Sequence, residues 1–158
     1  MTHGHYDHIG ALATLKARFP AAAVMIHEAE REFLSNPSLN LSGWFGAGFS
    51  YAHEPERLLV DGAEIAMPDG SALRVLHTPG HTPGGLCFLW GDILFSGDTL
   101  FFEGVGRCDL LGGDEKTLLR SLREKLFTLP PETRVLPGHL NETTIAHERR
   151  HNPFLLDE

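Results

Sequence analysis

The apolar residues near the start of the chain recur at helical spacing. From Ile9 to Ala17 they fall three or four residues apart and Pro20 follows, so the pattern predicts a helix that begins at the N-terminal loop and ends near Phe19. A short β-prone run over residues 24–26 and a helix-prone stretch over 28–34 come next. The pattern changes at Arg57, after which strand signals dominate.

After Arg57, short β-prone runs alternate with turn signals such as Asp61-Gly62 and Gly91-Asp92, which predicts an antiparallel meander. The expected strands cover residues 58–60, 64–67, 73–76, 86–90 and 93–96. Asp114 then caps a predicted helix whose buried face carries Leu118, Leu119, Leu122 and Leu126. A last short strand over 134–136 and a helix over 144–151 complete the pattern.

Residues 35–52 interleave glycines with large aromatic side chains, among them Trp44, Phe45 and Tyr51. This mixture is typical either of a well-packed irregular loop or of a mobile apolar flap over a pocket. Both interpretations stay open from the sequence.

The composition is that of an ordinary globular protein, with 42% hydrophobic and 22% charged residues. A length of 158 residues predicts a single domain over residues 1–158. The net charge of -8 argues against a nucleic-acid partner. With no apolar run near the roughly 20 residues that span a bilayer, and no secretory signal, we expect a cytoplasmic protein without a membrane partner.

The two cysteines are too few for a disulfide framework, so both are expected to be reduced. Cys87 lies in an apolar run, where burial explains it. Cys108 lies in a glycine-rich loop and is the better candidate for a reactive thiol, although no base is adjacent in sequence.

The N-terminal segment concentrates side chains that bind transition metals: His3, His5, Asp7 and His8. Imidazole and carboxylate ligands suit zinc, iron or manganese. A purification tag would repeat histidine without the aspartate and glycine. Structural zinc sites usually recruit several cysteines and this motif has none, so the sequence favours a catalytic metal site that needs further ligands.

Three later residues are candidates for those ligands. His81 lies in a rigid Pro/Gly frame, which favours it over the nearby His77. Asp98 follows a predicted strand directly, and His139 repeats the Pro-Gly-His arrangement after another strand. His27 is expected to be structural, and His147 with His151 is expected to lie on a surface without a third ligand.

Taken together, the His-x-His-x-Asp-His motif and the later His81, Asp98 and His139 resemble the metallo-β-lactamase superfamily. The loop 104–109 and the segment from His139 to Leu155 look like the small glyoxalase II-like hydrolases. The resemblance covers essentially the whole chain. It implies an α/β fold, the metallo-β-lactamase-like αββα sandwich, here N-terminally truncated because several strands precede the motif in family members.

The resemblance also implies a ligand set for two divalent metal ions, with zinc favoured and iron or manganese as alternatives. His3, His5 and His81 would hold one ion, Asp7, His8 and His139 the other, and Asp98 both; the catalytic aspartates would be Asp7 and Asp98. Two ions about 3.5 to 4 Å apart provide a hydroxide between them near neutral pH. The expected reaction is hydrolysis of a thioester or small ester.

Several alternatives remain at this point. A bridging Asp98 is not a feature of true metallo-β-lactamases, so antibiotic hydrolysis is not expected as the main activity. The rival activity is a mononuclear iron persulfide dioxygenase, which the loop around Arg107 also resembles. A glutathione thioester is a plausible small-molecule substrate, although the C-terminal helical domain that contacts glutathione in larger relatives is absent.

The absent strands give a third alternative, a non-catalytic remnant of the fold. A sheet without its first strands would expose an edge and an apolar face. We therefore expect either a longer parent protein, a homo-oligomer or a second chain that covers this face.

Overall fold

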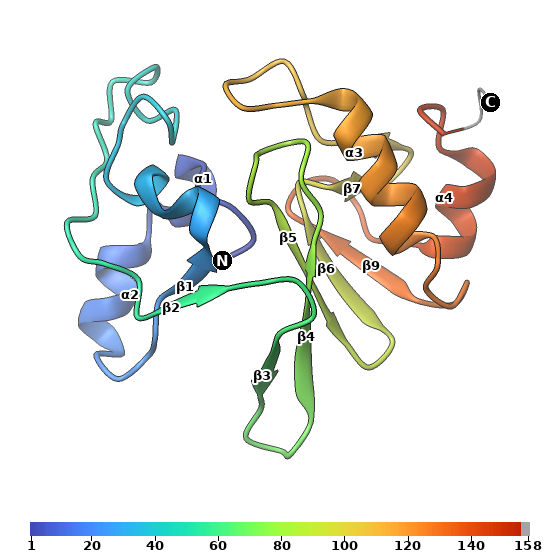
Figure 1. The fold of residues 1–158 in the computed structure, drawn as a ribbon, viewed down its shortest axis with the longest axis horizontal. Coiled ribbons are helices and arrows are strands. Elements are labelled where there is room, and N and C mark those ends of the chain that lie inside the picture. Colours follow the sequence, from blue (N-terminus) through green and yellow to red (C-terminus); the bar gives the residue numbers. More distant parts are fainter. Residues whose placement is uncertain (156–158) are drawn as a thin grey trace.

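The centre of the fold is a six-stranded mixed sheet with the strand order β10-β9-β6-β5-β4-β3 (Figure 1). In the computed structural model, which describes residues 1–155, these strands are β3 (Glu64–Ala66), β4 (Ala72–His77), β5 (Leu86–Trp90), β6 (Ile93–Gly97), β9 (Arg134–Pro137) and β10 (Thr143–Thr144). Four of them form the predicted meander, β3 to β6, with antiparallel neighbours. The prediction is confirmed for these four strands, but the first expected strand, over residues 58–60, was wrongly placed in the meander, because residues 57–59 pair in parallel with residues 25–27 in a separate sheet.

β9 joins the sheet differently, because it pairs with β6 in parallel. The chain leaves β6, passes through helix α3 (Glu115–Ser121) and returns alongside β6, which is the usual way to connect parallel neighbours. As a result β4, β6 and β9 all run in the same direction.

Two further small sheets were only partly expected. β1 (Met25–His27) and β2 (Arg57–Leu59) pair in parallel, one residue away from the predicted strands. β7 (Leu100–Phe101) and β8 (Gly104–Val105) form a hairpin that the sequence did not indicate. Such two-residue strands lack a periodic signal.

The predicted N-terminal helix is two helices, α1 (Tyr6–Ile9) and α2 (Leu12–Arg18). The chain bends at Gly10, where a side chain would collide with the ring and carbonyl oxygen of Tyr6. The bend lets both Ile9 and Leu12 enter one apolar cluster.

The other helices differ from the predictions mainly in their type. The stretch Glu28–Leu34 is a 3-10 helix, η1. Asp114 caps α3 as predicted, but the helix then widens into a π-turn, η2 (Leu122–Leu126), in which the N–H of Phe127 donates to the carbonyl of Leu122 at 2.9 Å. Leu119, expected to be buried, is only half-buried. The last helix is α4 (Ile145–His151).

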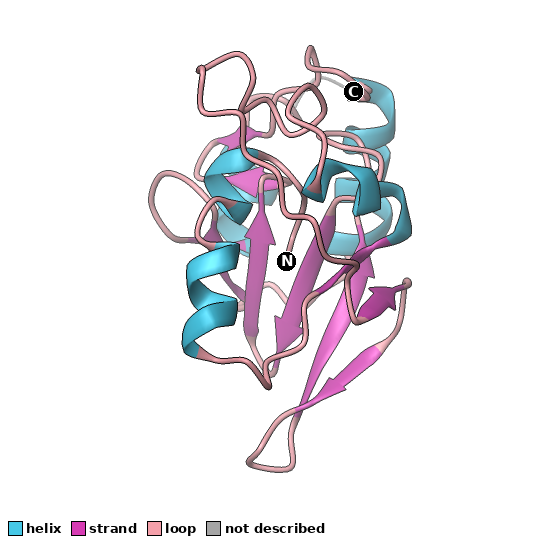
Figure 2. Ribbon diagram, turned by 90° about the vertical axis from the view of Figure 1, so that its left-hand side faces the viewer, coloured by secondary structure: helices cyan, strands magenta, loops and turns pink. Residues whose placement is uncertain are grey.

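Figures 1 and 2 show the layers of the molecule. α3 and α4 cover one face of the six-stranded sheet, and the N-terminal unit, with α1, α2, β1 and β2, lies on the other side. The αββα arrangement is therefore confirmed, with a second sheet of two strands. Within the described residues, no helix combines the length and apolar character needed to cross a membrane.

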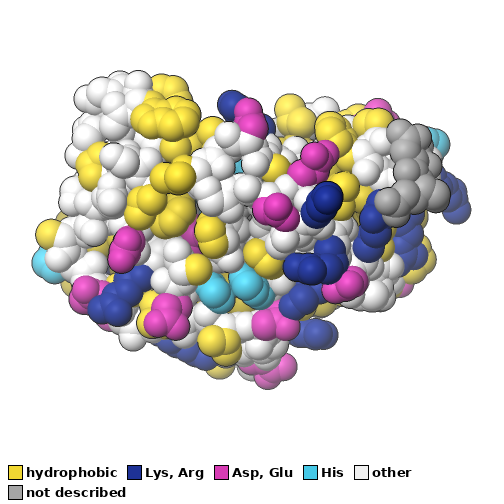
Figure 3. Space-filling view, turned by 45° about the horizontal axis from the view of Figure 1, so that its top comes forward, with side chains coloured by type: hydrophobic (Ala, Val, Ile, Leu, Met, Phe, Trp, Pro, Cys, Tyr) yellow, Lys and Arg dark blue, Asp and Glu magenta, His cyan; other side chains and the backbone are white. Residues whose placement is uncertain are grey.

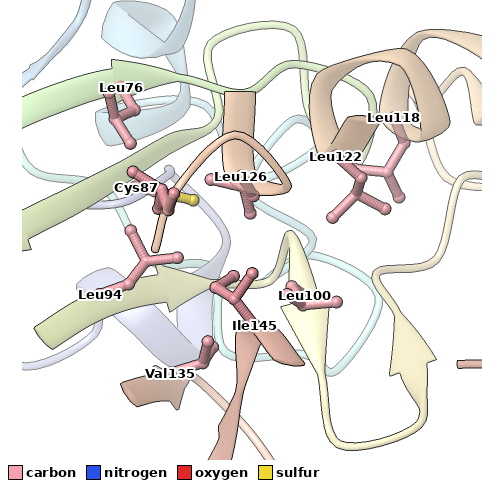
Figure 4. Close-up of a cluster of buried hydrophobic side chains, with 10 residues drawn as sticks. Leu76, Cys87, Leu94, Leu100, Leu118, Leu122, Leu126, Val135 and Ile145 are labelled. Carbon is pink, nitrogen blue, oxygen red and sulfur yellow. The ribbon is translucent and has the colours of Figure 1, made fainter. Parts of the chain in front are cut away.

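The main core lies between the sheet and its covering helices (Figure 4). Leu118, Leu122 and Leu126 are fully buried there against strand residues such as Cys87 and Leu94. Because successive strand residues point to opposite faces, Leu86 and Phe88 belong to a separate cluster on the other face.

That other face is only partly covered, as the sequence led us to expect. An apolar groove of about 400 Å³ runs between the α2 side of the N-terminal unit and the sheet. Leu15 and Phe19 line one wall, and Ile65 and Leu73 line the other.

Candidate metal centre

The candidate ligands meet at one edge of the six-stranded sheet. His81, Asp98 and His139 follow β4, β6 and β9, and these strands run in the same direction, so their side chains arrive at the same edge. The N-terminal loop lies against this edge, since the carbonyl of Thr2 accepts a hydrogen bond from the N–H of Leu86 at 2.8 Å. This loop and α1 supply the remaining four side chains: His3, His5, Asp7 and His8.

Three histidines form the buried part of the site. The rings of His3, His5 and His81 lie with their centroids 4.7 to 4.8 Å apart. His81 Nδ1 lies 2.7 Å from the carbonyl oxygen of Arg107. A carbonyl can only accept, so Nδ1 carries the proton and the lone pair of Nε2 points at His5 Nδ1, 3.0 Å away.

Asp7, His8 and His139 form a second, more exposed group. His139 Nε2 lies 3.1 Å and His8 Nε2 3.5 Å from the same oxygen of Asp7. This group opens onto a cavity of about 540 Å³, which Asp7 and His139 help to line.

Asp98 lies between the two groups. Its Oδ1 is 3.2 Å from His8 Nε2, and its Oδ2 is 3.7 Å from His81 Nε2 and 3.5 Å from His139 Nε2. One carboxylate therefore faces histidines of both groups. This is the position that the sequence resemblance implied for Asp98.

Several buried polar atoms at this centre have no hydrogen-bond partner within residues 1–155. They are Nε2 of His3 and of His5; Nε2 of His8 and Oδ1 of Asp98 also lack a partner with hydrogen-bond geometry, although they lie 3.2 Å from each other. Buried polar atoms are rarely left without partners, and an electron-pair acceptor such as a metal ion would explain unpaired nitrogen and carboxylate donors. Ligand atoms of neighbouring residues lie within 4.8 Å of one another, so the residues present fit a pair of divalent ions.

The electrostatics of the centre also fit metal binding. Burial lowers the pKa of His5 to about 4, and burial followed by repulsion from the neighbouring histidines lowers the pKa of His3 well below its usual value. Both rings are therefore neutral at pH 7, the form that binds a metal ion. Burial would raise the pKa of Asp98, but His8 and the other histidines outweigh it and lower this pKa.

Glu30 is a residue of the site that the sequence analysis missed. This buried carboxylate accepts hydrogen bonds from the N–H of Gly4 at 3.0 Å and from the N–H of Gly84 at 2.8 Å. Gly4 lies between His3 and His5, and Gly84 belongs to the loop of His81. Glu30 thus ties together the two loops that supply the buried histidines.

Two glycines also shape the centre by leaving room. A side chain at Gly138 would collide with the carboxylate of Asp98 and lie 2.7 Å from the ring of His8. A side chain at Gly106 would collide with the carbonyl oxygen of Asp98. Both glycines stood in motifs noted in the sequence, but the backbone approach that requires them is visible only in three dimensions.

Histidines judged non-ligating from the sequence lie away from the centre. His27 ends β1 and stacks on His77, with ring centroids 4.2 Å apart and planes within 7° of parallel. His147 lies 3.0 Å from a carboxylate oxygen of Glu103 and neighbours His151 on α4. None of these four is a member of the ligand groups found in the described residues.

Cys87 and Cys108 are both free thiols. Burial raises the pKa of Cys87 to about 11. The suggestion of a reactive Cys108 is not supported, because burial and the nearby carboxylates of Glu115 and Asp114 raise its pKa to about 11 as well. A thiol with this pKa stays protonated, and therefore weakly nucleophilic, at neutral pH.

The loop 35–52 is packed at its base and exposed at its tip. Its base is packed, since the side-chain amide of Asn40 donates to the carbonyls of Phe33 at 2.8 Å and Phe49 at 3.1 Å. Its tip is exposed, and Phe45 lines the cavity at the metal centre. His53, beyond the loop, is on the surface.

The fold and the cluster of ligands define a class of protein. The family model described as the metallo-beta-lactamase superfamily matches residues 1–139, and the chain belongs to this superfamily.

Among curated proteins, the chain is 41% identical over 157 residues to the "Probable metallo-hydrolase YqgX" of Bacillus subtilis (strain 168). It is 39% identical over 157 residues to the "Hydroxyacylglutathione hydrolase GloC" of Haemophilus influenzae. Each match covers 98% of this chain and 74% of the relative.

Among solved structures, the chain is similar to the BLEG-1 B3 metallo-beta-lactamase, with a TM-score of 0.92 and 40% identity. It is also similar to TTHA1623 in a di-iron-bound form, with a TM-score of 0.85 and 41% identity. Both matches cover 98% of this chain and 75% of the other chain.

Proposed function

We propose that this protein is a metal-dependent hydrolase that cleaves a thioester or small ester, as glyoxalase II-like enzymes do. The observation that carries the proposal is the convergence of seven histidine and aspartate side chains in three overlapping groups: His3, His5 and His81; His3, His8 and Asp98; and Asp7, His8 and His139. The likeness to a hydroxyacylglutathione hydrolase supports a thioester substrate.

We assign His3, His5 and His81 to one ion, Asp7, His8 and His139 to a second, and Asp98 to both. Zinc is the favoured metal, and iron or manganese suits the same ligands. When bound, two such ions supply Lewis acidity toward the substrate carbonyl and a water of lowered pKa.

The protein's own residues orient and complete this chemistry. Asp7 is half-exposed at the cavity and lies 3.1 Å from His139, so its carboxylate is placed to accept a proton from the attacking water. Asp98 is more deeply buried, and its two carboxylate oxygens lie 3.2 to 3.7 Å from His8, His81 and His139, so it links histidines of both groups. The water oxygen bonds to the carbonyl carbon, the carbon–sulfur bond breaks, and the leaving thiolate takes up the proton.

The direct test combines elemental analysis with a hydrolysis assay on S-lactoylglutathione. We expect two divalent ions per chain and release of a free thiol at a rate that depends on the metal. Asp98→Ala should lose metal and at least roughly 100-fold in kcat/KM, because a shared ligand is removed. Asp92→Asn, in an exposed turn after β5, is the matched control and should behave as wild type.

Other outcomes would contradict the proposal. Asp98→Ala with full activity and both metals would refute the assigned roles. A single iron with oxygen consumption on glutathione persulfide would identify the dioxygenase instead, and turnover of a β-lactam alone would agree with the likeness to BLEG-1. Tight metal binding without any turnover would favour a non-catalytic remnant.

A further inference from the structure

The cavity at the candidate metal centre has largely apolar walls. Beside the candidate ligands, its lining includes Leu41, Phe45, Phe101, Leu110 and Leu140. Among the described residues that line it, Arg107 is the only lysine or arginine. The guanidinium of Arg107 is already paired with the carboxylate of Asp109, with N to O distances of 2.9 and 3.0 Å.

Two of these apolar residues have unusually large exposed fractions. Phe45 is 78% exposed and Leu140 is 73% exposed, more than any other large hydrophobic residue within residues 1–155. They come from separate segments, the loop 35–52 and the turn after β9, and both line the same cavity. In the space-filling view, hydrophobic side chains form their most continuous run in the left-hand part of the face shown, while charged side chains lie on both the left and the right (Figure 3).

The backbone at the cavity gives an independent observation. Leu41 and Leu140 have φ angles of 66° and 67°, in the left-handed region that leucine rarely adopts. Glycine or asparagine would occupy either position with less strain. Strained residues of this kind cluster at ligand-binding sites, where the side chain is needed despite its backbone cost. Leu140, which directly follows the candidate ligand His139, fits that pattern.

We propose that Leu140, Phe45 and Leu41 form an apolar clamp that binds the hydrocarbon acyl group of the substrate and sets its chain length. The proposal rests on the proposed hydrolase function and narrows it to thioesters of short- to medium-chain fatty acids. A carbonyl at the metal centre would place its acyl carbons beside these side chains, because the clamp and Asp7 line one cavity. Each acyl CH₂ that leaves water for such a wall is worth roughly fourfold in kcat/KM.

The test is a series of acetyl, butanoyl and hexanoyl thioesters of one thiol, assayed with the metal-loaded protein. We expect kcat/KM to rise along the series. Leu140→Asn suits the left-handed backbone and removes the apolar surface, so it should lower kcat/KM for the hexanoyl ester by about tenfold and for the acetyl ester by less than about twofold. Its melting temperature should stay equal or rise.

Two matched controls isolate the clamp. Glu103→Asn changes the third non-glycine residue with positive φ, at 51°, which does not line the cavity, and should keep the wild-type chain-length series. Phe45→Ala should flatten the series, whereas Trp44→Ala, at an exposed neighbour that does not line the cavity, should not.

The outcomes separate this inference from the proposed function. Hydrolysis without chain-length dependence, or an equal loss on all esters in Leu140→Asn, would overturn the clamp and leave the hydrolase. If no thioester is cleaved, calorimetry with acetate and hexanoate decides. If hexanoate binds more tightly than acetate and Leu140→Asn abolishes the difference, the clamp is kept and the hydrolase function is rejected. If the two acids bind equally, the clamp is rejected.

Discussion

Glu30 shows how far single residues of the site could be predicted from the sequence. The seven candidate ligands were found because metal-binding residue types stand close together in one motif or follow strands in rigid loops. Glu30 carries no such signal, since the N–H groups it binds are 26 and 54 residues away in the chain. Its importance comes from three-dimensional contacts that no local pattern encodes.

We expect Glu30→Gln to weaken metal binding without removing a ligand. The carboxylate accepts from both Gly4 and Gly84, whereas an amide has only one oxygen and would direct its NH₂ group at one of the two N–H donors. Partners that orient metal ligands typically contribute about 10- to 100-fold in metal affinity. Competition with a chelator would measure the loss.

Glu32→Gln is the matched control, because Glu32 lies on the same 3-10 helix and is exposed. It should leave the metal affinity unchanged. An affinity equal to wild type in Glu30→Gln would show that the two loops hold their positions without this carboxylate.

At the scale of elements, the sequence predicted the bounds of the longer strands well and located the helices, but it missed the shortest strands and the types of several helices. A strand such as β5 is recognisable in the sequence as a run of β-prone residues between turn signals, and its observed bounds match the prediction. The bend at Gly10 reflects the close approach of Tyr6, and a hydrophobic pattern does not distinguish the 3-10 geometry of η1 or the π-turn of η2 from an α-helix, so periodicity could not reveal them. The short strands β7 and β10 are defined only by their partners.

Helix α4 depends on a buried carboxylate for its position. Glu148 accepts hydrogen bonds from the N–H of Glu103 at 3.0 Å, the hydroxyl of Thr143 at 2.6 Å and the amide of Asn152 at 2.8 Å. These bonds connect α4 to the β7–β8 hairpin and to β10. Removing one carboxylate would leave three donors without their acceptor.

Glu148→Ala should therefore destabilise the protein by about 2 to 4 kcal/mol, the range for breaking a buried hydrogen-bond network. Urea unfolding monitored by circular dichroism would measure the change. Glu142→Ala, which removes an exposed ion pair with Arg134, should cause little change. A similar small effect in both variants would mean that α4 is held by its apolar contacts alone.

At the scale of the whole molecule, the αββα layers were expected from the family resemblance, and one face of the six-stranded sheet carries an open apolar groove. Local patterns could not show the shape of that face, because its walls come from distant parts of the chain: Leu15 and Phe19 on one side, and Ile65 and Leu73 on the other. An apolar groove of about 400 Å³ open to water is costly to leave uncovered.

We expect this groove to bind an apolar fluorescent dye in the folded protein. Leu15 and Phe19 are each 53% exposed, so replacing both with glutamine should preserve the fold while reducing dye fluorescence by half or more. Leu111→Gln changes a residue that is 56% exposed outside the groove and should leave the signal unchanged. Equal losses in both variants would mean that the dye binds elsewhere. A different result would show that a second copy of the chain covers the groove. In that case the dye fluorescence of the wild type would fall as the protein concentration rises, and sedimentation would detect dimers of the wild type but not of the double variant.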